Sequence, residues 1–157
     1  MGQVGHVEGL YVAAAATSPC EARGDVEAVA GRGLVGDRYA EGLGTWWKPE
    51  KSGQHLTLIA AEVLDALRHE QGIALSDADA RRNVVTRGIA LGELMGRRFS
   101  VGEVECIGVR DCPPCAHLEG LTVPGVHAAL EGKGGLRAEI LTGGRIAVGD
   151  TIALLDS

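Results

Sequence analysis

The chain has 157 residues, of which 45% are hydrophobic and 24 are glycine, and its formal net charge is −6. This length and hydrophobic fraction predict a single domain over residues 1–157 with one core. A negative net charge gives no overall field that would attract nucleic acid or an anionic membrane. No apolar run approaches the ~20 residues of a membrane span, and no basic residue precedes the short apolar stretch 10–16, as a signal peptide would require. We therefore expect a cytoplasmic protein without nucleic-acid or membrane partners.

The first half of the chain predicts strands, a long irregular segment and one helix. Residues 4–14 and 26–30 have the composition and alternation of strands. Residues 31–54 are rich in glycine and lack periodicity, which indicates a long functional or lid-like loop. Residues 56–59 form a short β-prone run. Residues 60–71 place Val63, Leu64 and Leu67 at helical spacing and predict a helix of about three turns.

The second half of the chain predicts hairpins. The sequence of residues 96–103 recurs in similar form at residues 143–150, and each copy has glycine followed by an acid between two β-prone runs. That pattern is typical of a hairpin turn. Residues 124–131 are the clear helix of this half. Short strands, many glycines and few short helices predict a mainly β fold, either a barrel or a barrel-like sandwich.

A glycine pattern at residues 31–36 needs a separate interpretation. Gly31, Gly33 and Gly36 match the G-x-G-x-x-G pattern of dinucleotide-binding proteins. That function requires a helix to begin at the motif, so that its N-terminal amides point at a pyrophosphate. The residues that follow contain too many glycines for a helix. We interpret the motif as a glycine-rich turn.

The sequence Cys112-Pro113-Pro114-Cys115 is the most informative chemical feature of the chain. The two prolines stiffen the loop that carries both thiols. Four uses compete: a disulfide, a zinc site, a thioredoxin-type redox pair, and a reactive or metal-binding thiolate. A cytosolic protein argues against the disulfide, the lack of a second ligand pair against zinc, and the β-rich surroundings against thioredoxin. Arg110 is close in sequence, and a nearby cation favours the thiolate.

Basic residues and the remaining cysteines complete the candidate chemistry. Five arginines lie within 18 positions, and they form either a solvated basic face or an anion pocket: Arg81, Arg82, Arg87, Arg97 and Arg98. Cys106 lies within a β-prone run and is interpreted as a buried apolar residue. His55 is interpreted as a structural or surface residue, with hydrogen bonding to a ligand as the alternative.

Four motifs together resemble the MOSC domain, the domain found at the C-terminus of molybdenum cofactor sulfurases. They are Gly-Leu-Val-Gly-Asp-Arg-Tyr at 33–39, Arg-Arg-Asn-Val-Val-Thr-Arg-Gly at 81–88, Cys-Pro-Pro-Cys-Ala-His-Leu-Glu at 112–119 and Gly-Gly-Leu-Arg-Ala-Glu-Ile at 134–140. They occur in the order found in that family, and the resemblance covers nearly the whole chain. It implies a MOSC-like β-barrel.

The resemblance also implies a cofactor and a set of site residues. Cys115 would carry sulfur as a persulfide or bind molybdenum directly, with Cys112 as a neighbour that tunes it, resolves it or has no role. The cofactor would be the molybdenum cofactor, molybdopterin. The residues implied to hold its pterin and phosphate, or to add positive charge, are Arg38, Arg81, Arg82, Asn83, Arg87, Lys133 and Arg137.

Three functions follow from the resemblance. The first is an oxidoreductase component that reduces a small N-hydroxylated substrate and receives electrons from a separate electron-transfer protein. The second is a sulfur carrier that accepts a persulfide from a cysteine desulfurase. The third is a non-catalytic cofactor carrier. A chain of this length has no room for the desulfurase or ferredoxin-like domain that accompanies this domain elsewhere, so we expect a separate partner.

Overall fold

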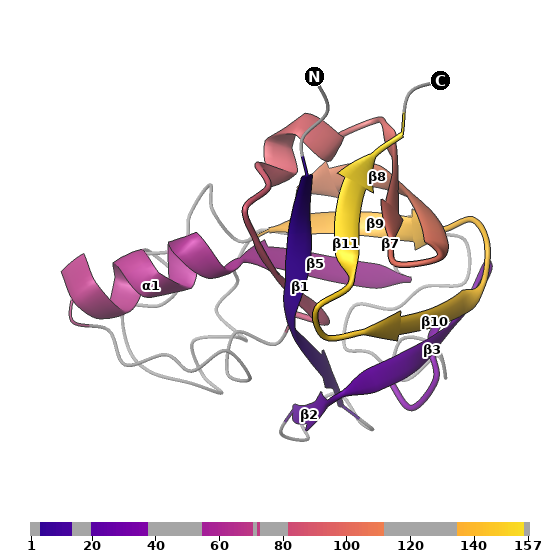
Figure 1. Ribbon diagram of the computed structural model, residues 1–157, viewed down its shortest axis with the longest axis horizontal. Helices are drawn as coiled ribbons and strands as arrows, with labels where there is room; N and C mark the ends of the chain where they lie inside the picture. The colour runs from indigo at the N-terminus through magenta and orange to yellow at the C-terminus, as the bar shows by residue number, and fades with distance from the viewer. Residues whose placement is uncertain are drawn as a thin grey trace.

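A computed structural model describes residues 4–13, 20–37, 55–70, 72, 82–111 and 135–155. These residues are mainly strands, with one α-helix and one short 3₁₀ helix (Figure 1). The elements in chain order are β1 (Val4–Val12), β2 (Glu21–Arg23), β3 (Asp25–Val29), β4 (Gly33–Leu34), β5 (Leu56–Ala60), α1 (Ala61–Glu70), β6 (Val84–Arg87), η2 (Leu91–Leu94), β7 (Arg98–Val101), β8 (Val104–Asp111), β9 (Leu136–Ile140), β10 (Gly144–Ala147) and β11 (Thr151–Leu154).

Within the described part of the chain, seven strands close into a barrel in the order β11-β7-β8-β9-β5-β6-β1. The pairing of β1 with β11 completes the circle. Neighbouring strands are antiparallel except β5 and β6, which are parallel. Parallel strands need a crossover connection, and α1 lies in the connection between these two. The mainly β, barrel-like fold predicted from the sequence is therefore confirmed.

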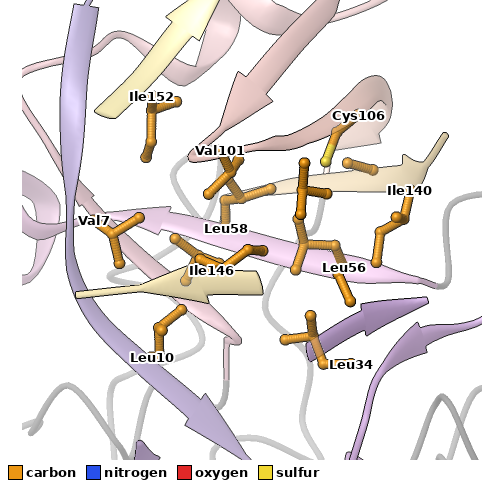
Figure 2. Packing of buried hydrophobic residues seen from close by; sticks show 14 of the residues in the cluster. Val7, Leu10, Leu34, Leu56, Leu58, Val101, Cys106, Ile140, Ile146 and Ile152 are labelled. Atoms are coloured by element: carbon orange, nitrogen blue, oxygen red, sulfur yellow. The ribbon is translucent and has the colours of Figure 1, made fainter. Parts of the chain in front are cut away.

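The barrel interior is filled by alternate residues of its strands. On β9 the buried positions Leu136, Ala138 and Ile140 alternate with half-buried Arg137 and Glu139. This alternation is what a strand with one face toward a core requires. Figure 2 shows that Leu34 of β4 and Ile146 of β10 join the cluster formed by barrel residues such as Leu56 and Leu58. The small sheet β10-β3-β4 thus packs against the barrel through a shared core.

Strand β5 is buried on both faces, and α1 follows it directly in the chain. Leu56 and Leu58 belong to the barrel core, while Ile59 points the opposite way and is also fully buried. Helix α1 contacts both β5 and β6, and its Leu64 and Leu67 are buried. The spacing of those two leucines predicted the helix, and α1 differs from the predicted bounds of 60–71 by one residue at each end.

The recurring glycine-acid motif gives a turn in both copies but a hairpin in only one. At Gly102-Glu103 the flanking strands β7 and β8 pair directly, with Val101 opposite Val104. At Gly149-Asp150 the chain also turns, with Asp150 N donating to Ala147 O over 3.0 Å. However, β10 pairs with β3, and β11 pairs with β7 and β1. The predicted second hairpin is therefore wrong, because a local turn signal does not determine which strand each arm pairs with.

The glycine motif at residues 31–36 forms a turn, as interpreted from the sequence. Strands β3 and β4 are antiparallel, with Val29 opposite Gly33. Gly31 has φ of 73° and Gly36 has φ of 90°, values that side-chain-bearing residues rarely adopt. The predicted helix at 124–131 and most of the predicted irregular segment lie outside the described residues.

Candidate functional site

The segment that contains Cys112 and Cys115 lies outside the described residues, but the strands that flank it are well defined. Strand β8 ends at Asp111, which is opposite Leu136, the first residue of β9. Both ends of the segment 112–134 are therefore attached to neighbouring points of the barrel wall.

Gly135 shows why glycine is required where the chain re-enters the barrel. It has φ of 114°, and a Cβ atom added there would lie 2.0 Å from the carbonyl oxygen of Leu58. A side chain at this position would clash with backbone and also strain its own backbone. Gly135 thereby fixes the start of β9 against β5, one residue before Leu136.

Two arginines face each other next to these attachment points. Arg110 of β8 is directly opposite Arg137 of β9, just after a bulge in the β8–β9 pairing. Both side chains are half-buried. Arg137 alternates with core residues, so it points away from the barrel interior. Like charges directly opposite each other on a sheet are unfavourable, and an anion bound between them would offset that repulsion.

Asn83 joins three strands on the same outer face. Its Oδ1 accepts hydrogen bonds from Thr57 N at 3.0 Å and from Thr57 Oγ1 at 3.1 Å. Its backbone N donates to Thr57 Oγ1 at 3.0 Å, and its Nδ2 donates to Tyr11 O at 3.2 Å. Thr57 is in turn opposite Arg137. These contacts define the outer row, which consists of Tyr11, Asn83, Thr57, Arg137 and Arg110.

Arg82 is the residue before Asn83 in the chain, and it is buried, with 9% of the residue exposed. A guanidinium is seldom buried unless it is paired, because removing it from water is costly. Arg82 and Asn83 lie just before β6, and Arg137 lies on β9, with β5 between these two strands. The structure thus brings three of the predicted cofactor-binding residues to the same part of the barrel wall.

Arg87 lies at the opposite end of β6 and contacts two carboxylates. Its Nη2 is 3.0 Å from Glu8 Oε2 and 2.8 Å from Asp65 Oδ2. The hydrogen bond from Arg87 lowers the pKa of Glu8 against the opposing effect of burial. Hydrogen bonds from Arg87 and Arg68 lower the pKa of Asp65. Arg87 therefore links β1, β6 and α1, and the structure does not bring it to the outer row.

Five predicted site residues lie outside the described part of the chain: Arg38, Arg81, Cys112, Cys115 and Lys133. Their roles stay predictions. Sequence reasoning noted Arg110 as a cation close to Cys112 but did not include it among the cofactor-binding residues. It did not assign Thr57 to the site. Thr57 offered a weaker signal, as a polar residue between two leucines in a buried strand.

Cys106 and His55 have structural environments. Cys106 is fully buried among apolar side chains (Figure 2), and burial, with a smaller contribution from Glu105, raises the pKa of its thiol to about 12. It is an inert thiol, as interpreted from the sequence. His55 accepts a hydrogen bond at Nδ1 from Ile140 N at 2.9 Å, and burial lowers its pKa against the effect of Glu139.

The described residues contain neither a candidate metal-binding group nor a candidate membrane-spanning helix. No group of three or more His, Cys, Asp or Glu side chains among them could hold a metal ion. No helix in that part of the chain is long and apolar enough to cross a membrane.

Solved structures with the same fold include three bacterial proteins. The YuaD protein of Bacillus subtilis is 18% identical, with a TM-score of 0.79, and the match covers 98% of this chain and 97% of that one. YiiM of Geobacillus stearothermophilus is 14% identical, with a TM-score of 0.73 and coverage of 97% and 75%. YiiM of Escherichia coli is 17% identical, with a TM-score of 0.62 and coverage of 96% and 70%.

A comparison with curated proteins gave no match. The family model described as the MOSC domain matches residues 43–153, more than half of the chain. This match includes strands β5 to β10, most of β11, every outer-row residue except Tyr11, and the Cys-Pro-Pro-Cys segment. The chain therefore belongs to the MOSC domain family.

Proposed function

We propose that this protein binds the molybdenum cofactor and serves as an oxidoreductase component that reduces N-hydroxylated compounds with electrons from a separate electron-transfer protein. Membership of the MOSC family supports this proposal. The structural observation that carries it is the pair Arg110 and Arg137, which face each other at the two ends of the cysteine segment.

The described residues suit the binding of an anionic cofactor such as molybdopterin. Molybdopterin carries a phosphate, and arginine forks match phosphate oxygens in a bidentate manner. Arg110 and Arg137 provide two guanidiniums on adjacent strands, and buried Arg82 adds a third cation beside Asn83. Asn83 has a different role, because its contacts with Thr57 and Tyr11 tie the segment that contains Arg82 to β5 and β1. Arg87 is not one of the cations proposed to bind the phosphate, because two carboxylates neutralise it.

Cys115 is the proposed metal ligand. Its thiolate would be favoured by the arginines that flank its segment, since nearby cations lower the pKa of a thiol. Molybdenum is a soft enough partner for thiolate sulfur. When bound, the cofactor would supply the two-electron chemistry of the overall reaction, in which R–NHOH, two electrons and two protons give R–NH₂ and water. The electron-transfer partner supplies both electrons.

The test is the molybdenum and pterin content of protein purified from a host that synthesises the cofactor. We expect wild type and Cys112→Ser to contain both, and Cys115→Ser to lose molybdenum. Arg98→Gln is a matched control, because Arg98 pairs with Glu105 on the barrel wall away from the outer row.

Molybdenum-free wild type that matches Cys115→Ser would contradict the proposal. Mass spectrometry of the same samples after incubation with a cysteine desulfurase separates the alternative. A sulfur adduct on Cys115 without molybdenum would indicate a sulfur carrier. Molybdenum without reduction of any N-hydroxylated compound, when electrons are supplied, would indicate a cofactor carrier.

A further inference from the structure

A cavity of about 610 Å³ lies where strand β5 passes into helix α1, next to the start of β9. The residues around it come from β5, α1, the segment after β6, and the beginning of β9. They are Ala60, Glu62, Val63, Gly88, Ile89, Ala90, Leu91, Gly92, Met95, Gly135 and Leu136. Its volume is within the range of small-molecule binding sites.

The described residues that line this cavity are apolar residues and glycines, apart from one carboxylate. Among the described residues that line it, Glu62 is the charged one. Its Oε2 accepts a hydrogen bond from Gly88 N at 2.8 Å, which holds the carboxylate between α1 and the segment after β6. An apolar pocket with one positioned polar group is the usual design of a site that binds an apolar molecule in a fixed orientation.

The cavity lies close to the points where the chain leaves β8 and enters β9, on either side of the cysteine segment. Leu136 lines the cavity, and it is opposite Asp111, the residue before Cys112. Arg137 follows Leu136 and points away from the barrel interior. A molecule in the cavity would therefore lie beside the attachment points of the cysteine segment.

We propose that this cavity binds the apolar body of the substrate, and that Glu62 selects substrates whose polar group is cationic or donates hydrogen bonds. This inference rests on the proposed function, and it names the substrate class as apolar N-hydroxylated amines. Burial of the apolar body provides affinity, and the carboxylate repels anions while attracting nitrogen cations.

The test uses three probes of similar shape and different charge: benzylamine, benzyl alcohol and phenylacetate. The chain has only two methionines, Met1 and Met95, and Met95 lines the cavity. Methyl NMR of protein labelled at methionine therefore reports binding through a single resonance in the cavity wall. We expect benzylamine to shift this resonance at lower concentration than benzyl alcohol, and phenylacetate to bind least.

Three variants sharpen the measurement. In Glu62→Gln the amide oxygen can still accept from Gly88 N, so the fold is kept. We expect benzylamine to bind about fivefold to tenfold more weakly there and benzyl alcohol to be unchanged. Ala90→Phe should abolish binding of both amine and alcohol, because Ala90 lines the cavity and a phenyl ring there would fill it. Ala90 is exposed and its backbone is extended, with φ of −83°, so the fold should accept the larger side chain. Ala22→Phe, at an exposed position on β2, is the control and should bind like wild type.

Tight binding of phenylacetate, or unchanged binding in Ala90→Phe, would overturn this inference. These measurements need no cofactor, so the two proposals can fail separately. Molybdenum-free protein that still binds benzylamine in the expected way would refute the proposed function and support the cavity assignment. Molybdenum-loaded protein whose Met95 resonance does not respond to benzylamine would refute the cavity assignment alone.

Discussion

The two ends of strand β6 bear predicted cofactor-binding residues that have different surroundings. At its end, Arg87 is neutralised by Glu8 and Asp65 and ties α1 to the barrel. Just before its start, Asn83 lies in the outer row. In the same row, Arg137 of β9 faces Arg110 of β8. An arginine therefore cannot be assigned to an anion site from its sequence cluster alone, because carboxylates from distant segments decide whether its charge is already compensated.

The largest effect is expected for Asn83→Ala, which removes the shared partner of β5 and β1. Thr57 N and Tyr11 O would each lose a buried hydrogen bond, so we expect a loss of about 3 kcal/mol in the free energy of unfolding. Urea denaturation measures this change. Thr57→Val should cost less, about 1 to 2 kcal/mol, because Asn83 Oδ1 still accepts from the backbone at position 57. An Asn83→Ala protein as stable as wild type would show that the outer row is not held in this way.

An intermediate effect is expected for Arg137→Gln, with Arg87→Gln as its matched comparison. Removing Arg137 should lower the affinity for molybdopterin or a phosphate analogue about tenfold, because it removes charge-assisted hydrogen bonds to the anion. Arg87→Gln should leave the affinity unchanged. Isothermal titration calorimetry measures both variants, and equal losses of affinity would remove the distinction between the two ends of β6.

The smallest effect concerns the dependence of stability on pH. The folded-state pKa values of Glu8 and Asp65 are lowered by Arg87, so their contribution is fully present above the unfolded values of about 4. It is lost as the pH falls through the lowered folded values. Arg87→Gln should therefore reduce the acid sensitivity of the urea midpoint between about pH 5 and pH 2. An unchanged pH profile in that variant would place the source of acid sensitivity elsewhere.

Local sequence patterns predicted the positions of strands and helices better than they predicted which strands pair with each other. Alternation gave β1 and β3 nearly to their observed bounds, and the spacing of leucines gave α1. The pairing of β10 with β3 was missed, because the turn at Gly149 carries no information about a strand more than a hundred residues earlier in the chain.

The same limit applies to the candidate site. Glu8 lies 79 residues from Arg87 in the sequence, and Asp65 lies 22 residues away. No spacing rule connects them, so the ion pairs of Arg87 could not be predicted from the sequence. Arg82, Asn83 and Arg137 were found from their motifs, and the fold then placed them on either side of β5. The role of the Cys-Pro-Pro-Cys segment stays a prediction.

The pairing of β1 with β11 has a consequence for folding during synthesis. Val4 is opposite Ala153, and the two ends of the described chain lie side by side (Figure 1). The ring of strands cannot close until the last strand has left the ribosome. Until then β1 has an open edge, and unpaired edges promote strand exchange with other chains. The nascent protein is therefore prone to aggregation until β11 has been synthesised and pairs with β1.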